Sequence, residues 1–338
     1  MKLRQVSTRH LPVLSAMAIA GAMALFGSLR YEHFAAPATM TNLLSEYAFV
    51  GVAAVGATFV IISGGIDLSV GSMIAFTSIL IALLMQRGVH PLAAATIALI
   101  IGTFIGAAMG WIIHVFRLPA FIVTLAGMFA LRALGFAVHD QSIGIHHDFY
   151  SWASREATIG LGGGASLPLR SMIMLVVLLA GVFVARYTGF GRNVYAMGGN
   201  ARSARLMGVP IAATTIAVYA LSGFTAALAG FVFTLYKHAG DPASVVGLEL
   251  DVIAAVVIGG TLLSGGVGGV GGTLIGLIIL GLIRTIIDFE GSLNAAWTSI
   301  ATGALLLLFV ALQQLLGTLG GVMRGRGTHI SGAHATGS

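Results

Sequence analysis

Long apolar stretches recur along the whole chain, and they limit the folds that it can adopt. About 20 apolar residues form a helix that crosses the hydrocarbon core of a bilayer. Residues 249–262 are short for a span, and few polar residues separate the stretch 43–62 from the stretch 69–86. The pattern predicts an all-α, polytopic membrane protein with eight to ten transmembrane helices. The stretches cover residues 11–29, 43–62, 69–86, 92–116, 119–138, 171–187, 212–235, 249–262, 268–287 and 297–316.

Composition excludes most other classes of protein. Charged residues make up only 8% of the 338 residues, against about 25% in soluble chains. The absence of cysteine excludes disulfides, thiolate metal sites and thiol redox couples. The net charge is +6, but there are only two lysines, Lys2 and Lys237, and no basic run exceeds two residues. We therefore expect membrane lipid and not nucleic acid as the surroundings of this chain.

Basic residues indicate the orientation. Lys2, Arg4 and Arg9 precede the first apolar stretch and could suggest a signal peptide, but that stretch continues to Leu29 and further spans follow. With ten spans and an inner N-terminus, 10 of the 17 basic residues fall in inner segments: Lys2, Arg4, Arg9, Arg117, Arg186, Arg192, Arg202, Arg205, Arg324 and Arg326. The positive-inside rule then predicts that both termini are cytoplasmic.

The domain organisation follows from this topology. We expect a cytoplasmic N-terminus at 1–10, one transmembrane permease domain at 11–316 and a cytoplasmic tail at 317–338. Two longer polar segments interrupt the domain, 139–170 outside and the basic, glycine-rich 186–211 inside. The outer one contains His139, His146 and His147 with Asp140 and Asp148; a metal site is conceivable, but a solvated loop is the simpler interpretation, and we predict no metal site.

Enzyme motifs do not fit this chain. Residues 266–271 match the dinucleotide pattern G-x-G-x-x-G with Asp288 downstream, but a fully apolar span follows them, so we interpret them as a bend between packed helices. Neither a P-loop nor a Ser-His-Asp arrangement is present. We predict no catalytic residue and no cofactor, and any ATPase must be a separate subunit.

Several polar and small residues inside the spans suggest packing or a pathway. Glycines at 102, 106 and 110, and again at 268, 272 and 276, have the four-residue spacing that lets membrane helices approach closely. Arg284 and Asp288 are four residues apart and can pair on one helix face. This pair and Arg132 are either structural or part of a transport pathway.

A break in the helices is expected at residues 62–72. Glycine releases the backbone there, and Asp67 or Ser69 can cap the helix that follows; Asp67 could instead pair with an arginine. Broken backbone at membrane depth needs cover by protein or a water-filled path. The segment is therefore either a tight cytoplasmic turn or an element of a pathway or gate. Its candidate residues are Gly64, Gly65, Asp67, Ser69 and Gly71.

The same residues carry a resemblance to a known family. Residues 64–72, GGIDLSVGS, resemble the signature of the permease subunits of bacterial sugar ABC importers, in the ribose/xylose/arabinose branch. Segments that agree in the same order are 118–125, 190–200, 204–208 and 257–261, and the resemblance extends over about 40–320. Ala133 departs from the glycine that the family often has. Within the family, 200–208 and 261–268 are most similar to a permease of a galactofuranose importer.

The resemblance implies a location and partners. These are the bacterial inner membrane, a cytoplasmic ATP-binding subunit, a second permease and a periplasmic sugar-binding protein. The second permease is a non-identical chain or a second copy. Ribose, xylose or another monosaccharide is the alternative substrate, and an ATP-independent facilitator or channel is the alternative of a different class. Neither the residues nor the resemblance identifies the residues that bind substrate.

The resemblance also gives segment 198–210 a role, because such permeases dock a short cytoplasmic helix in a groove of the ATPase. Asn200 can cap this helix, Ser203, Ala204 and Gly208 are small enough for close approach, and Arg202 and Arg205 can reach acidic groups. A basic loop that only fixes the topology is the alternative. The candidate coupling residues are Gly198, Gly199, Asn200, Arg202, Ser203, Ala204, Arg205 and Gly208.

Overall fold

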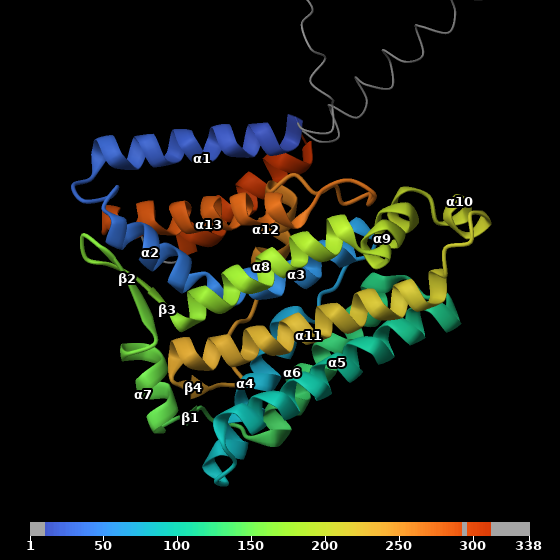
Figure 1. The fold of residues 1–338 in the computed structure, drawn as a ribbon, viewed down its shortest axis with the longest axis horizontal. Coiled ribbons are helices and arrows are strands. Elements are labelled where there is room, and N and C mark those ends of the chain that lie inside the picture. The colour runs from blue at the N-terminus through green and yellow to red at the C-terminus, as the bar shows by residue number, and fades with distance from the viewer. Residues whose placement is uncertain (1–10, 293–295, 312–338) are drawn as a thin grey trace, which may run out of the picture.

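The chain is built from helices that lie roughly side by side (Figure 1). The structure is a computed structural model that describes residues 11–292 and 296–311. Its helices are α1 (Leu11–Arg30), α2 (Pro37–Glu46), α3 (Ala48–Ile62), α4 (Val70–Gln86), α5 (Pro91–Phe116), α6 (Ala120–Val138), α7 (Asp148–Arg155), α8 (Leu169–Tyr187), α9 (Gly189–Gly199), α10 (Ala201–Leu206), α11 (Ile211–Lys237), α12 (Leu248–Ile258), α13 (Val270–Glu290) and a last helix, Ala296–Ala311.

Four short strands complete the described part. They are β1 (Ile143–Gly144), β2 (Thr158–Gly162), β3 (Ala165–Pro168) and β4 (Ala239–Gly240). β1 pairs with β4, and β2 pairs with β3, both antiparallel. The predicted all-α, polytopic class is confirmed, because these strands lie in connections between helices.

Within the described residues, nine of the ten predicted apolar stretches each coincide largely with one helix, and 43–62 is divided between α2 and α3. Residues 312–316 of the last stretch lie outside the described residues. By length and composition, α1, α5, α6, α8, α11 and α13 can cross a membrane, and α2 with α3, bent by 56°, forms a seventh candidate. α4 and Ala296–Ala311 are apolar but shorter. α12 has 11 residues, too few to cross on its own when about 20 are needed.

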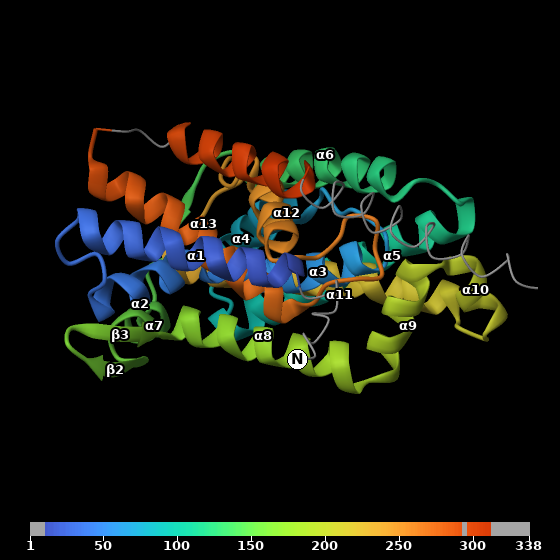
Figure 2. The same ribbon diagram turned by 90° about the horizontal axis from the view of Figure 1, so that it is seen from above.

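α3 is the centre of the molecule. All 15 of its residues are buried, as expected for a helix that is apolar on every face. It packs against α8, α9, α11, α12 and α13. In Figure 2 it lies beneath α1 and between the outer helices. The elements around its ends are thereby held by a core that is continuous through the molecule.

The glycine repeats mark the closest helix contacts. In α5, a side chain on Gly110 would meet the Ile216 Cα of α11 at 2.9 Å, and Gly106 lies directly against the Tyr219 carbonyl. In α13, Gly272 and Gly276 lie against the backbone of α12. The predicted packing role is confirmed at these positions. Gly268 differs, since it precedes α13 in a loop.

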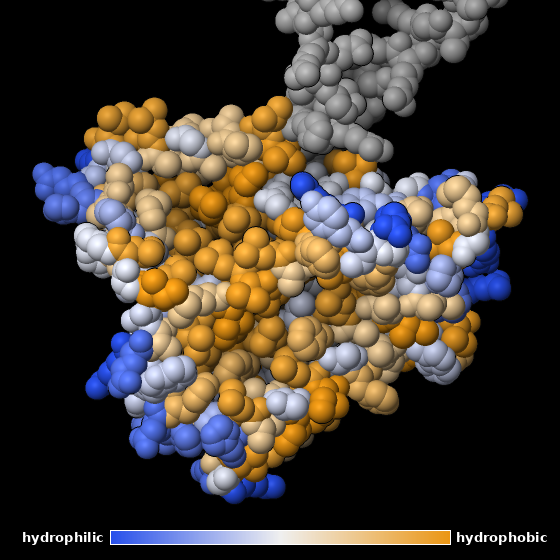
Figure 3. Space-filling model, viewed as in Figure 1, coloured by the Kyte–Doolittle hydropathy of each residue, from blue (hydrophilic) through white to orange (hydrophobic). Residues whose placement is uncertain are grey.

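Polar residues gather at two opposite ends, with an apolar surface between them (Figure 3). At one end, 139–170 forms α7 and the β2–β3 hairpin. At the other end, 186–211 forms α9 and α10 instead of an irregular loop. Figure 2 shows α7 and α10 at opposite ends of the helices. This arrangement matches a chain that exposes its two long polar segments on opposite sides of a bilayer.

Candidate functional site

The predicted break between α3 and α4 is confirmed. α3 ends at Ile62, the backbone turns at Gly64 with φ +86°, and an extended stretch leads to Val70. Gly65 is required for another reason: its φ is not positive, but the Tyr219 hydroxyl occupies the space where a Cβ would lie. Gly71, in the first turn of α4, likewise lies against Glu249.

Asp67 fastens the break to two other elements. Its side chain is buried, with 4% of the residue exposed. Oδ1 accepts hydrogen bonds from the Ser69 backbone N–H at 2.9 Å and from the Ser69 hydroxyl at 2.6 Å. Oδ2 accepts from the Ser222 hydroxyl of α11 at 2.7 Å. Neither of the two roles predicted for Asp67 is observed. The N-cap residue of α4 is Ser69, no side chain caps the helix, and Asp67 instead binds the N–H and hydroxyl of Ser69 just before the helix begins. The described ion pairs belong instead to Arg284.

Three glycine-rich segments meet beneath the break. The Gly266 N–H donates to the Ile62 carbonyl at 2.8 Å. A side chain on Gly198 would collide with that same carbonyl, and one on Gly265 would lie 2.9 Å from the Gly64 Cα. The end of α9, the end of α3 and the loop before α13 are thus joined backbone to backbone. The contact places the end of α9 directly against the backbone of the break.

The bend at 266–271 also borders a cavity of about 620 Å³. The Tyr195 hydroxyl of α9 donates to the Gly268 carbonyl at 2.8 Å. Burial raises the pKa of the Tyr195 phenol, so it stays protonated as the donor. Arg186 and Gly199 are among the lining residues. As predicted, the glycine run is a bend between helices, α12 and α13.

α10 presents a small, exposed surface. The Asn200 side chain accepts from the Ser203 N–H at 2.9 Å, which confirms the predicted cap. Two large apolar residues follow, with Leu206 85% and Met207 72% exposed. Gly208 has a φ of +84° with no atom near its side-chain position. The other exposed residues of α10 are Ala201, Arg202, Ser203 and Arg205.

Ala204 is a correction. It was predicted among the small residues that allow close approach by a partner, but its exposed fraction is 0%. It faces inward because the short helix packs against α9 and α11. Leu206 and Met207 are not among the predicted coupling residues, although two adjacent large apolar residues between Arg205 and Gly208 are a signal that the sequence carries.

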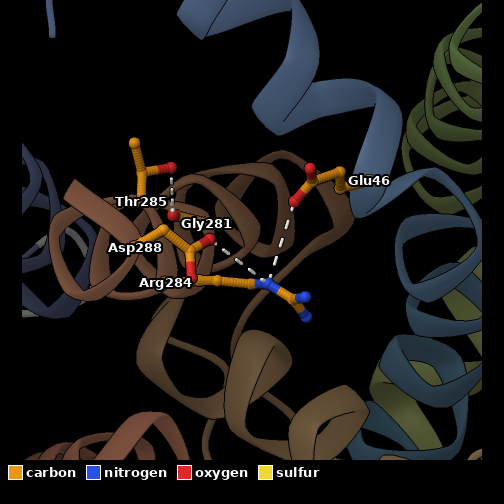
Figure 4. A network of polar contacts seen from close by, with 5 residues as sticks. All are labelled: Glu46, Gly281, Arg284, Thr285 and Asp288. Atoms are coloured by element: carbon orange, nitrogen blue, oxygen red, sulfur yellow. Dashed lines mark hydrogen bonds and ion pairs between the residues drawn. The ribbon is translucent and has the colours of Figure 1, made fainter. Parts of the chain in front are cut away.

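Arg284 joins two helices at the other end of the molecule (Figure 4). Its Nε lies 3.7 Å from the Asp288 carboxylate, confirming the predicted pair, and 3.8 Å from Glu46 at the end of α2. The Thr285 hydroxyl donates to the Gly281 carbonyl in the same turn. The charged side chains are about half exposed, so each pair contributes little in water.

The outer histidines do not form a metal centre in the described residues. No group of three or more His, Cys, Asp or Glu side chains there is arranged to hold an ion. His147 instead accepts the Phe149 N–H at the start of α7.

Comparison with known proteins gives consistent matches. The model of the family described as "Branched-chain amino acid transport system / permease component" matches residues 39–310. The chain is 48% identical to the inner membrane ABC transporter permease protein YjfF of Escherichia coli (strain K12), over 92% of this chain and 94% of that protein.

Two further relatives carry import functions in their names. The ribose import permease protein RbsC of Escherichia coli (strain K12) is 37% identical, over 80% of this chain and 84% of that protein. The fructose import permease protein FruG of Bifidobacterium longum (strain NCC 2705) is 34% identical, over 94% of each chain. No solved structure matches the chain.

A permease component is a transport subunit and not an enzyme, since a separate subunit of an ABC transporter hydrolyses ATP. The family model covers most of the chain, and the relatives align over most of their own length. The chain therefore belongs to the branched-chain amino acid transport system permease components, a polytopic family of ABC transporter subunits in the bacterial inner membrane.

Proposed function

We propose that this chain forms the translocation pathway of an ATP-driven sugar importer and that its sugar is galactofuranose. The names of the relatives support a sugar, because they specify ribose and fructose import. The choice of galactofuranose rests on the likeness of residues 200–208 and 261–268 to that subfamily. Ribose, xylose and other monosaccharides are the alternatives that the experiment below separates.

The observation that supports coupling of ATP hydrolysis to transport is the contact of Gly198 with the Ile62 carbonyl. ATP binding and hydrolysis on a partner shift a transporter between conformations only if the partner contacts something that differs between them. α10 offers that contact through Leu206 and Met207, with Arg202 and Arg205 beside them for acidic groups. α9 passes the displacement to the break between α3 and α4, where Asp67 and Gly64 set the backbone.

The proposed partners follow from this arrangement. α10 and both termini face the cytoplasm, where an ATP-binding subunit docks. A periplasmic sugar-binding protein delivers substrate at the end that carries α7 and the β2–β3 hairpin. A second permease, non-identical or identical, completes the pathway. The proposed organisation is a transmembrane domain over 11–316 with cytoplasmic ends at 1–10 and 317–338.

Uptake by cells that express the complete importer tests the substrate. The cells receive radiolabelled galactose, which contains the furanose form at equilibrium, with unlabelled ribose, xylose, fructose or leucine as competitors. We expect uptake that orthovanadate, an inhibitor of the ATPase, abolishes and that none of the competitors reduces. A competitor that abolishes the uptake of labelled galactose would instead be assigned as the substrate of the pathway.

Deletion of the ATPase separates an importer from a facilitator. Uptake should then fall to background, and the ATPase should co-purify with the intact permease from detergent. Uptake that persists without the ATPase would identify an ATP-independent facilitator or channel and contradict the proposal.

A further inference from the structure

A non-helical segment connects β4 to α12, and it follows α4 along its length. The Asp241 N–H donates to the Ser78 hydroxyl at 3.3 Å. Farther along, the Val245 carbonyl lies 3.2 Å from the side-chain position of Gly71, near the start of α4. The segment from Asp241 to Gly247 therefore runs beside α4, from Ser78 toward the start of that helix, before α12 begins at Leu248. Figures 1 and 2 both show α4 and α12 in the interior of the molecule.

Helix geometry places this segment deep in the membrane. Gly71 is 15 residues from the end of α4 at Gln86, which is about 22 Å at 1.5 Å per residue. Counted from the opposite end, Ser222, the partner of Asp67, is 11 residues from the start of α11, or about 16 Å. In a hydrocarbon core of about 30 Å, the first count puts Gly71 and the neighbouring Val245 inside the core, and the second puts the nearby Asp67 inside it as well.

The polar groups of the segment are largely satisfied from within the chain. Arg132 of α6 donates from Nη1 to the Ser244 carbonyl at 2.9 Å and to the Pro242 carbonyl at 3.4 Å. The Asp241 carboxylate accepts from the Ala243 N–H at 2.9 Å and from the Ser244 hydroxyl at 2.6 Å. These hydrogen bonds give a structural reason for the presence of a charged residue, Arg132, in the apolar helix α6.

The lower half of the segment remains open and strained. Val246 is 76% exposed, and Leu250, in the first turn of α12, is 58% exposed. Val245 has a φ of +56°, in the left-handed region that a β-branched residue rarely adopts. Glu249 is partly exposed, and its buried Oε2 has no hydrogen-bond partner among the described residues.

Exposed, irregular backbone beside a carboxylate cannot face lipid at this depth, because hydrocarbon satisfies neither the backbone polar groups nor the charge. We propose that residues 241–250 line the sugar translocation pathway and that Glu249 is its polar contact. An ionised carboxylate only accepts hydrogen bonds, and sugar hydroxyls are the donors that it would meet. The identity of the ligand rests on the proposed function, whereas the water-filled path rests on the backbone and its depth.

Cysteine labelling tests the path without any transport measurement, because the chain has no cysteine of its own. Val246→Cys is compared with Phe104→Cys, in α5, since these residues are similarly exposed at 76% and 74%. Both are treated, in membranes that contain the complete importer, with a membrane-impermeant, positively charged methanethiosulfonate. We expect Val246→Cys to react and Phe104→Cys to stay unmodified in lipid. Leu250→Cys serves if the first variant fails to insert.

Sugar uptake tests Glu249. Glu249→Gln should raise the KM for sugar by about tenfold, because a hydrogen bond to a charged group is replaced by a weaker one. Glu249→Asp should restore part of the affinity. Asp288→Asn, a change in an outer, half-exposed acid, should leave the KM unchanged.

Each outcome has one meaning. If Val246→Cys and Leu250→Cys both insert and stay as unreactive as Phe104→Cys, the proposal that residues 241–250 line a water-filled path is wrong. Cross-linking of Val246→Cys between two permeases without such reactivity would assign the segment to a dry interface and also overturn it. A reactive Val246→Cys with an unchanged KM for Glu249→Gln would remove Glu249 from the proposal. A parent importer that takes up no sugar would contradict the proposed function but leave the labelling result standing.

Discussion

At the scale of single residues, two charged side chains among the apolar helices each hold a backbone segment in place. Asp67 ties the helix break to Ser69 and Ser222, and Arg132 holds the carbonyls of Pro242 and Ser244. The sequence could indicate a local hydrogen bond of Asp67 near the start of α4, because the partner, Ser69, is two positions away, but the predicted helix cap was wrong. It could not indicate Ser222, which is 155 residues distant and meets Asp67 only once α11 has packed.

Replacement of Asp67 by alanine tests the role of the break. It leaves the Ser222 hydroxyl and the Ser69 N–H without their acceptor, at a cost of about 1–3 kcal/mol for each buried group. We expect normal amounts of protein in the membrane and uptake lowered by about tenfold, equivalent to about 1.4 kcal/mol. Asp67→Asn keeps a side-chain acceptor, so its uptake should lie between that of the parent and that of Asp67→Ala. If both variants take up sugar at the parental rate, residues 62–72 are an inert turn and have no role in transport.

At the scale of elements, the helices could be predicted and their contacts could not. Apolar length located every described span, and glycine spacing located the contact of α5 with α11, since both patterns are local. The meeting of Gly198, Ile62 and Gly266 joins three distant segments through backbone atoms that carry no sequence pattern. The inward direction of Ala204 likewise depends on how α10 packs against α9 and α11, and for that reason its predicted exposure was wrong.

Adjacent glycines at the end of α9 give a matched test of coupling. A methyl group on Gly198 would collide with the Ile62 carbonyl, whereas one on Gly199 has no atom within 4 Å. Gly198→Ala should force α9 away from the break, at about 1–3 kcal/mol for overpacking. We expect ATP hydrolysis by the purified complex to continue while uptake falls severalfold. Gly199→Ala should behave as the parent, and equal effects of the two substitutions would contradict this role for the contact.

The exposed residues of α10 provide a second test. Truncation of Leu206 and Met207 to serine removes apolar surface that only a partner can bury, and burial stabilises by about 25 cal/mol per Å². We expect the double variant to insert normally but to co-purify with less ATPase, and uptake to fall in proportion. Substituting Phe104 of α5 and Leu179 of α8 in the same way is the control, because these residues are similarly exposed but do not belong to α10. Unchanged co-purification would exclude α10 as the docking surface.

At the scale of the whole molecule, two polar ends and an apolar middle define a chain that crosses the bilayer repeatedly (Figure 3). The charge pattern predicts which end is cytoplasmic, because arginines concentrate in 186–211 and near both termini. The positions of α9 and α10 opposite α7 agree with such a division. They are equally compatible with either end facing the cytoplasm. The orientation therefore needs its own experiment.

Reporter fusions decide the orientation. A reporter active only in the periplasm, joined after residue 330, should be silent, because an even number of spans returns the chain to the side of its basic N-terminus. The same reporter joined after Gly163, in the exposed turn between β2 and β3, should be active, which shows that the fusions are inserted and exported. A third fusion after Gly208, beside α10, should again be silent. If the fusions after 330 and Gly208 are active and the one after Gly163 is silent, the whole bundle is inverted. The proposed ATPase contact at α10 would then lie on the wrong side of the membrane, so this one reversal would overturn the docking surface together with the topology.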